Sequence, residues 1–147
     1  MEITIIKTEH AHLPKIHEIE LDIFPVPWSM QSFINELDNP NAYYFTAMME
    51  SGEIVGFGGM WHIINEGHIV NVAVKHEYRR LGAGRRIVSR LLELAAEKEM
   101  IGVTLEVRMN NTAAQRLYTS FGFQPEGIRK NYYPETKEDA IIMWKYF

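Results

Sequence analysis

The first third of the chain has hydrophobic positions with two different spacings. Residues 2–7 alternate weakly between apolar and polar side chains, which predicts a first strand. Within residues 11–21, Leu13, Ile16 and Ile19 recur at helical spacing. The chain is therefore expected to begin with a strand followed by a helix.

A proline-rich segment interrupts this pattern. Residues 24–28 contain two prolines, which exclude regular helix because each proline fixes its own backbone and extends the residue before it. Ser29 then predicts the N-cap of a short helix over 30–37, and Asn39-Pro40 predicts its end.

Three apolar runs with strand character come next. They cover 43–49, 54–62 and 68–74. The first two are separated by the hairpin sequence 50–53, and the last two by the turn 65–67. These runs predict an antiparallel meander.

The pattern changes at Gly84. Apolar residues at helical spacing predict the longest helix, to about Lys98, and a strand follows over 102–108. A second helical stripe runs from Ala114 to Phe121 and ends at Gly122.

The C-terminal part is predicted as a polar loop over 131–138 and a closing strand over 140–146. Meander strands followed by strand–helix–strand–helix units indicate an α/β or α+β fold around a mixed sheet. With 147 residues and 46% hydrophobic content, we expect a single domain, 1–147.

Composition narrows the function classes. The net charge of −4 gives no sign of a nucleic-acid or membrane-surface partner, and no stretch approaches the roughly 20 apolar residues of a membrane helix. Residues 1–12 lack the apolar core of a signal peptide. The absence of cysteine excludes thiol nucleophiles and disulfides and fits a cytoplasmic location.

A glycine-containing loop, Arg79-Arg80-Leu81-Gly82-Ala83-Gly84, lies between a predicted strand and a predicted helix. Such a loop offers free backbone N–H groups and the positive end of a helix dipole to an anion. Six of the fifteen basic residues lie within 75–90, which suggests a polyphosphate ligand; a turn followed by a solvated helix face is the alternative. The loop lacks the Gly-Lys-Ser/Thr of a P-loop and the third glycine of a dinucleotide fingerprint.

The loop resembles the Arg/Gln-x-x-Gly-x-Gly/Ala motif of the GNAT N-acetyltransferases, and Arg79, Gly82 and Gly84 match it. Other segments resemble the RimI-type branch, which acetylates alanine at the N-terminus of ribosomal proteins. They are Pro27-Trp28-Ser29, Asn71-Val72-Ala73-Val74, the run from Leu105 to Phe123, and the run from Arg129 to Met143. The resemblance implies a mixed, mostly antiparallel sheet, splayed between its fourth and fifth strands, where acetyl-CoA lies.

The resemblance also implies cofactor contacts. The backbone of Val72, Ala73 and Val74 would bind the pantetheine arm, and Asn111 would touch the cofactor near its reacting end. The pyrophosphate would be held by the loop residues Arg79, Arg80, Leu81, Gly82, Ala83, Gly84 and Arg85.

Acetyl transfer needs a base, because an α-amino group with a pKa of about 8 is mostly protonated at neutral pH. Glu106 alternates with Val103, Leu105 and Val107 and therefore lies on the opposite face of its strand. From the residues alone it is either a solvent-facing acid, paired with Arg108, or a base facing a cleft. The resemblance implies the base.

Tyr118 lies on the helical stripe of Ala114, Leu117 and Phe121, so a core role is open. The resemblance implies that Tyr118 is the general acid that protonates the departing thiolate, which its ordinary pKa of about 10 would suit.

Two loops that contain aromatic residues, 23–29 and 131–137, are the candidate substrate groove. Trp28, Tyr132 and Tyr133 are the predicted wall residues, although Trp28 has an equal interpretation as a core anchor. The acids Glu135, Glu138 and Asp139 suggest either a preference for a basic peptide or a solvated hairpin tip.

No metal site is expected, because no ligand set completes the histidines at 10, 12 and 17, and His62, His68 and His76 are scattered. The predicted function is acetyl-CoA-dependent acetylation of a protein N-terminus, with an N-terminal alanine of a small-subunit ribosomal protein as the implied substrate. The alternatives are acetylation of a small amine or lysine side chain, and a non-catalytic acyl-CoA-binding module. The oligomeric state is left open.

Overall fold

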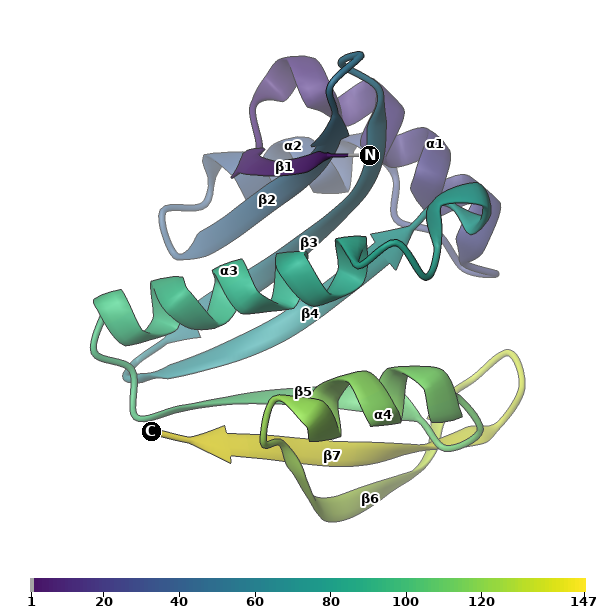
Figure 1. Cartoon of the computed structure of the whole chain (residues 1–147). Helices are drawn as coiled ribbons and strands as arrows, with labels where there is room; N and C mark the ends of the chain where they lie inside the picture. The colour runs from purple at the N-terminus through teal and green to yellow at the C-terminus, as the bar shows by residue number, and fades with distance from the viewer. Residues whose placement is uncertain (1) are drawn as a thin grey trace.

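A computed structural model describes residues 2–147, which form one mixed sheet covered by helices on both faces (Figure 1). The seven strands have the order β1-β2-β3-β4-β5-β7-β6. The strands are β1 (Ile3–Lys7), β2 (Ala42–Met49), β3 (Ile54–Ile63), β4 (Glu66–Val74), β5 (Gly102–Arg108), β6 (Gln124–Tyr133) and β7 (Glu138–Tyr146). Neighbouring strands are antiparallel except β4 and β5, which confirms the predicted fold class.

The helices are α1 (Leu13–Ile23), α2 (Met30–Asp38), α3 (Ala83–Glu97) and α4 (Thr112–Ser120), with 3-10 turns at His10–His12 and His76–Tyr78. Ser29 caps α2 as predicted, because its side chain accepts a hydrogen bond from the backbone N–H of Ser32. None of the helices in residues 2–147 is long and apolar enough to cross a membrane.

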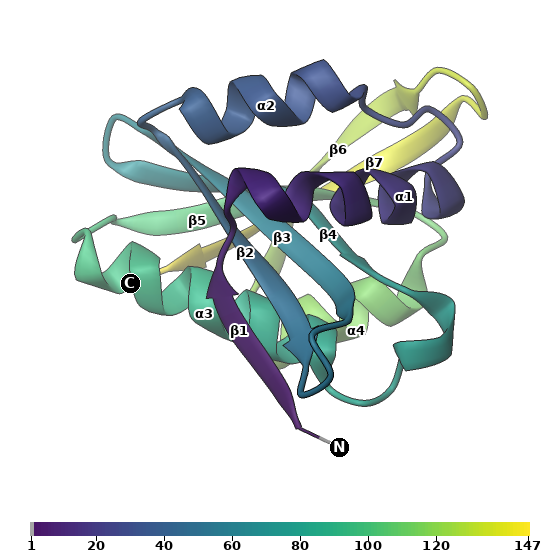
Figure 2. The same ribbon diagram turned by 90° about the horizontal axis from the view of Figure 1, so that it is seen from above.

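Figure 2 shows α1 and α2 on one face of the sheet and α3 and α4 on the other. Each face has its own hydrophobic core. Ile16, Phe33 and Phe57 are fully buried beneath α1 and α2, whereas Ile87 and Leu91 of α3 are buried on the opposite face. The amphipathic stripe of each helix is thus turned towards the sheet.

The predicted polar loop over 131–138 was wrong in part. Residues up to Tyr133 belong to β6, which forms a hairpin with β7, and only residues 134–137 lie between the two strands. This strand was missed because it is the edge of the sheet and nearly all of it is exposed. Pro125 and Gly127, at an interruption of the ladder, also weaken the strand pattern.

Candidate active site

The parallel strands β4 and β5, at the centre of the sheet, are paired over only part of their length. Residues 66–68 of β4 lie opposite residues 102–104 of β5, and beyond these three pairs the strands separate (Figure 1). The ladder to β3 also shifts beside Val70. Within residues 2–147, the facing edges of 69–74 and 105–108 therefore have no strand partner, which confirms the splay expected from the family resemblance.

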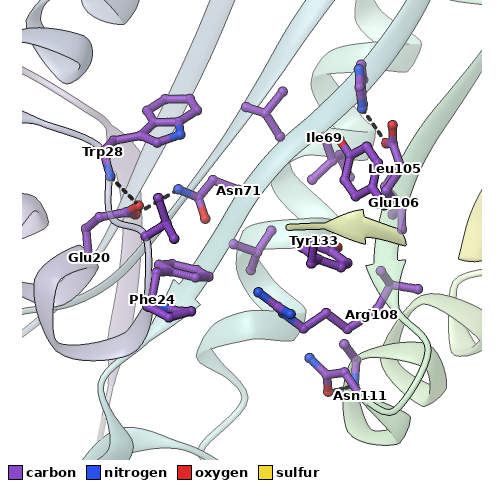
Figure 3. A pocket seen from close by; sticks show the side chains of 18 of the residues that line it. Glu20, Phe24, Trp28, Ile69, Asn71, Leu105, Glu106, Arg108, Asn111 and Tyr133 are labelled. Carbon is purple, nitrogen blue, oxygen red and sulfur yellow. Dashed lines mark hydrogen bonds and ion pairs between the residues drawn. The ribbon is translucent and has the colours of Figure 1, made fainter. Parts of the chain in front are cut away.

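A cleft of about 420 Å³ occupies this opening and reaches both faces of the sheet (Figure 3). Its wall on the α1 side includes Glu20 and Trp28, and its wall on the α4 side includes Asn111 and Tyr118. Seven of the predicted site residues line it together: Trp28, Val72, Glu106, Asn111, Tyr118, Tyr132 and Tyr133. The rest lie outside the lining: Ala73, Val74, Arg79, Arg80, Leu81, Gly82, Ala83, Gly84 and Arg85.

Glu106 faces the cleft with its side chain 10% exposed. Its Oε2 lies 2.7 Å from Nε2 of His68, and its Oε1 lies 3.5 Å from Nε of Arg129. The hydrogen bond with His68 is the main cause that holds the pKa of Glu106 below its usual value, while burial acts in the opposite direction. Because an ionised carboxylate only accepts hydrogen bonds, Nε2 of His68 carries the proton.

The pairing of Glu106 with Arg108, considered from the sequence, was wrong. Arg108 turns instead towards the β6–β7 hairpin, where it pairs with Glu135 and with Oε1 of Glu138, the latter at 3.1 Å. The two charged residues of β5 therefore have separate partners.

Tyr118 is 8% exposed, and its ring meets that of Phe123 edge-on at 5.6 Å. Its hydroxyl makes no hydrogen bond within residues 2–147, yet every fully buried side-chain nitrogen and oxygen there has a partner. The hydroxyl is therefore accessible from the cleft. Burial raises the pKa of Tyr118, so the side chain holds its proton at neutral pH.

Asn111 lies at the start of α4 as its N-cap. Its Oδ1 accepts a hydrogen bond from the backbone N–H of Ala114 at 3.1 Å. About two turns further along α4, Tyr118 lies on the same cleft wall.

The glycine-containing loop has an unusual backbone. Arg80 and Gly82 both have positive φ angles, 68° and 86°, and Gly82 is the N-cap of α3 without a side-chain cap. The first hydrogen bond of the helix runs from Arg86 to Gly82 at 3.0 Å, so the backbone N–H groups of 83–85 have no partner within residues 2–147. A helix terminus of this kind suits an anion.

This helix end lies beside the α4 face of the cleft. Nε of Arg79 donates to the carbonyl of Val74 at 3.2 Å. A Cβ built on Gly84 would lie 3.8 Å from both Val74 and Leu117, so α3 begins between the end of β4 and α4.

Several of the six basic residues within 75–90, the basic cluster, already bind other groups of the protein. Arg86 donates to the backbone carbonyl of Ile3, and Arg90 pairs with Glu97 at 3.4 Å and Glu93 at 3.7 Å. Both guanidinium groups therefore have partners within the protein, and we do not assign them to the polyphosphate site that the concentration of six basic residues suggested.

Two further cations of the cluster have partners. Lys75 pairs with Glu53 at 3.2 Å, and Arg85 donates to Oγ of Ser120 at 3.0 Å. Arg80 is exposed and makes no side-chain hydrogen bond or ion pair within residues 2–147.

Trp28 combines both roles considered from the sequence. Its ring packs against the buried Phe33 at 5.4 Å, and it also lines the cleft. Its backbone N–H donates to Oε2 of Glu20 at 3.0 Å, while Oε1 of Glu20 accepts from Nδ2 of Asn71 at 2.9 Å.

Tyr132 and Tyr133 meet edge-on at 5.0 Å, and the guanidinium of Arg108 lies 3.8 Å from the centre of the Tyr133 ring. Burial raises the pKa of Tyr133 to about 12. Arg108 also pairs with Glu135 and Glu138 and so connects the tip of the hairpin to the end of β5.

Each of the three hairpin acids has a basic partner within the protein. Glu135 and Glu138 pair with Arg108, and Asp139 pairs with Lys130 at 3.2 Å. The hydrogen bond with Arg108 lowers the pKa of Glu135. The backbone N–H of Asn131 and the side chain of Lys130 lower the pKa of Asp139.

Sequence reasoning missed four polar residues of the cleft: Glu20, His68, Asn71 and Arg108. His68 was set aside as scattered, although a parallel pairing with residues 102–104 would place it beside Thr104 and hence near Glu106. Within residues 2–147, no three His, Asp or Glu side chains form a group that could hold a metal ion.

Residues 13–123 match the family model described as the acetyltransferase (GNAT) family. The ribosomal protein bS18-alanine N-acetyltransferase of Escherichia coli K12 is 34% identical over 142 residues, covering 95% of each chain. A Bacillus subtilis protein, for which the same activity is a provisional assignment, is 43% identical over 130 residues, 88% of this chain and 85% of that one.

Solved structures agree with these matches. The crystal structure of the ribosomal-protein-S18-alanine N-acetyltransferase from Escherichia coli superposes with a TM-score of 0.90 at 33% identity, over 99% of this chain and 94% of that chain. Ard1 from Thermoplasma volcanium has the same fold, with a TM-score of 0.90 at 24% identity over 99% and 98%.

Proposed function

The chain belongs to the GNAT family of acetyltransferases, and on that premise we propose that it acetylates the N-terminal amine of a protein, with the N-terminal alanine of ribosomal protein bS18 as its substrate. Acetyl-CoA is the acyl donor. Relatives that cover almost the whole chain and carry this activity in their names support the proposal. The reaction would take place in the cytoplasm.

The observation that carries the proposal is the cleft through the splayed sheet. Because it reaches both faces, donor and acceptor can approach from opposite sides and meet between β4 and β5. Glu106 lies on the wall formed by β5, and Tyr118 lies on the wall formed by α4.

The donor side is formed by β4, α3 and α4. We assign the unpaired backbone edge of Val72, Ala73 and Val74 to the pantetheine arm, and Asn111 to a contact near the thioester. The pyrophosphate is assigned to the loop Arg79–Gly84 and to Arg85, where backbone N–H groups at the start of α3 are free.

The chemistry needs a base on one wall and an acid on the other. Glu106 is the base, and its carboxylate accepts a proton from the substrate ammonium. The neutral amine then attacks the thioester carbon, the carbon–nitrogen bond forms, and the carbon–sulfur bond breaks. Tyr118 donates its proton to the departing sulfur and recovers one from the reacting nitrogen.

The acceptor side is formed by the α1–α2 loop and the β6–β7 hairpin. Trp28 borders it on one side, and Tyr132 and Tyr133 border it on the other. Aromatic walls of this kind bind an extended peptide end by apolar contact, while their polar tips stay hydrated.

The test is thiol release from acetyl-CoA with two peptides. The first has the free N-terminal sequence of bS18, beginning with alanine, and the second has a blocked N-terminus and one internal lysine. Since the protein contains no cysteine and both peptides are made without it, every thiol detected is coenzyme A.

Release with the first peptide alone is the expected result. Release with the second peptide would instead indicate a lysine acetyltransferase, and release only with small free amines would indicate a small-amine enzyme. Tight acetyl-CoA binding without any release would mean that the chain is a non-catalytic acyl-CoA-binding module.

A further inference from the structure

A buried carboxylate on the acceptor wall has no part in the proton transfers above. Glu20 of α1 is 2% exposed, and it forms no ion pair within 4.0 Å among residues 2–147. It lines the cleft together with its two hydrogen-bond partners, Trp28 and Asn71. Burial raises the pKa of Glu20, and these two hydrogen bonds oppose that rise.

The donors around Glu20 determine how the amide of Asn71 is oriented. The backbone N–H of Trp28 can only donate, and it occupies Oε2 at 3.0 Å. The other oxygen, Oε1, accepts from Nδ2 of Asn71 at 2.9 Å. An amide that gives its NH2 group to a carboxylate must turn its carbonyl oxygen elsewhere, because the two ends of the planar group point apart.

The free end of Asn71 is therefore an acceptor. Figure 3 shows Asn71 next to Glu20, with its side-chain oxygen turned away from that carboxylate. Oδ1 makes no hydrogen bond within residues 2–147, and Asn71 lines the cleft beside Val70, where the ladder to β3 shifts.

The position of Oδ1 of Asn71 favours a contact with the amine substrate over a contact with acetyl-CoA. Asn71 lies with Glu20 and Trp28 on the α1 side, whereas the free helix end and Tyr118 lie on the side of α3 and α4. A polar group at the cleft that lacks a protein partner is best satisfied by a ligand, since an unpaired polar group is costly once water is displaced.

We propose that Oδ1 of Asn71 accepts a hydrogen bond from an N–H group of the acceptor substrate, and that Glu20 is the positioning residue that fixes this polarity. The N–H is either the α-ammonium or the first peptide N–H of the acceptor. The identity of the acceptor as a peptide rests on the proposed function.

Glu20→Gln tests the polarity with almost no change of shape. The backbone N–H of Trp28 still needs an acceptor, so the glutamine keeps its oxygen there and turns its NH2 group towards Asn71. Asn71 must then accept with Oδ1 and turn Nδ2 into the cleft. We expect the KM for the peptide to rise about tenfold, the effect of losing one hydrogen bond to the peptide, with the KM for acetyl-CoA unchanged.

Two further variants are compared with Glu20→Gln, one that removes Oδ1 of Asn71 and one that serves as a control. Asn71→Ala should raise the peptide KM by a similar factor, and adding Glu20→Gln to it should have no further effect, because both changes remove the same acceptor. Glu36→Gln is the matched control. Glu36 of α2 is half-buried and, like Glu20, accepts from two donors, here the hydroxyl of Tyr44 and Nε1 of Trp61, but both bond the same oxygen, which glutamine retains.

Thermal unfolding checks that each variant is folded, and the side-chain amide protons of Asn71 report the polarity without any substrate. They should exchange slowly in the wild type and faster in Glu20→Gln, because the bond to the buried carboxylate is lost. Unchanged exchange, or a folded Glu20→Gln enzyme with an unchanged peptide KM, would overturn the proposal. A rise in the KM for acetyl-CoA instead would also overturn it, because Asn71 would then serve the donor.

The two sources of the N–H are separated by a peptide methylated on the nitrogen of its second residue. If Asn71 binds the first peptide N–H, methylation weakens the wild type to the level of Glu20→Gln; if it binds the ammonium, the tenfold difference persists. A wild type that accepts only small amines would refute the proposed function, and the same comparison made with that amine would still decide the role of Asn71.

Discussion

Glu106 and Tyr118, the side chains to which we assign the proton transfers, have opposite surroundings. Glu106 is held by His68 and Arg129, which keep its pKa low, whereas Tyr118 has no hydrogen-bond partner within residues 2–147 and burial raises its pKa. Two titratable groups whose environments separate their pKa values are suited to acid and base roles in one cleft.

Replacing Tyr118 by phenylalanine removes only a hydroxyl that bonds to no described residue. We expect kcat to fall by about 10²-fold or more, the usual contribution of a general acid. The KM for acetyl-CoA and the unfolding temperature should stay nearly unchanged, because the ring still packs against Phe123. Steady-state kinetics and thermal unfolding check this, and a loss of cofactor binding would mean that Tyr118 is a packing residue.

Glu106→Gln should reveal the charge of Glu106 in the pH dependence of stability. Because the folded-state pKa of Glu106 is depressed, its charge stabilises the fold above the ordinary glutamate value of 4.5. The extra free energy of unfolding of the wild type over Glu106→Gln should disappear as the pH falls through the depressed pKa of Glu106. Denaturant unfolding of both proteins at several pH values measures it, and a constant difference down to acid pH would contradict the assignment.

Single residues could be predicted from the sequence only where the pattern alone determines their position. Strand alternation was sufficient to place Glu106 on the face opposite Leu105. His68 could not be paired with Glu106 in this way, because the two are 38 positions apart and their contact depends on the parallel register of β4 and β5. Asn71 was recognised only as part of a motif, since its orientation depends on Glu20 of α1.

Among the structural elements, the loop before α3 depends on one left-handed position. Gly82 has φ of 86° and open space where a Cβ would lie, so Gly82→Ala is opposed by backbone strain alone. We expect a loss of about 1 kcal/mol in the free energy of unfolding and weaker binding of acetyl-CoA. Gly84→Ala, where a Cβ makes ordinary contacts at 3.8 Å, should keep its stability.

Gly52→Ala is the control for strain without a ligand. Gly52 lies in the β2–β3 hairpin with φ of 91° and open space around its Cβ position. Its alanine variant should lose stability as Gly82→Ala does, but should bind acetyl-CoA as the wild type does in calorimetric titration. Equal losses of affinity in both variants would show that the loop has no special part in binding.

β7 pairs with β5 along its length, and Arg108 at the end of β5 also holds the tip of the β6–β7 hairpin through Glu135 and Glu138. Arg108→Met should raise the peptide KM several-fold with little change for acetyl-CoA, because Tyr133 and Glu135 lose the group that positions them. Lys130→Met breaks the exposed pair with Asp139 on the same hairpin and should leave both KM values unchanged. Equal effects of the two variants would refute a special role for Arg108.

Elements with strong periodicity were predicted well, and those determined by tertiary context were not. The longest helix was predicted because its apolar stripe is buried along its whole length. The edge strand β6 was missed, since its mostly exposed residues carry no alternating pattern and Pro125 lies near its start.

In the molecule as a whole, the two parts of the sheet share only three residue pairs between β4 and β5. A ligand bound between these strands should therefore tie the two parts together. Acetyl-CoA at a hundred times its Kd should stabilise the fold by about 2.7 kcal/mol. Hydrogen exchange should slow most at 69–74 and 105–108, whose facing edges have no strand partner, and uniform protection across the sheet would contradict binding in the splay.

At this scale, the mixed sheet could be predicted from the order of the elements, and its family from the motifs. The hydrophobic pattern contains no sign of where β4 and β5 part, because both strands have buried residues along their whole lengths. The splay was expected only through the resemblance, which the comparisons confirm at the level of the family.

The separation of the two sides of the cleft also bears on how such a protein can diverge. The match to the family model ends at residue 123, just before the β6–β7 hairpin that borders the acceptor side. Mutations at the exposed positions of β6 can accumulate without disturbing the elements that we assign to the acyl donor, whereas Ala140 and Met143 of β7 are buried in the core. A gene duplicate could thus acquire a new acceptor by drift at these positions of β6 while it keeps the ancestral donor.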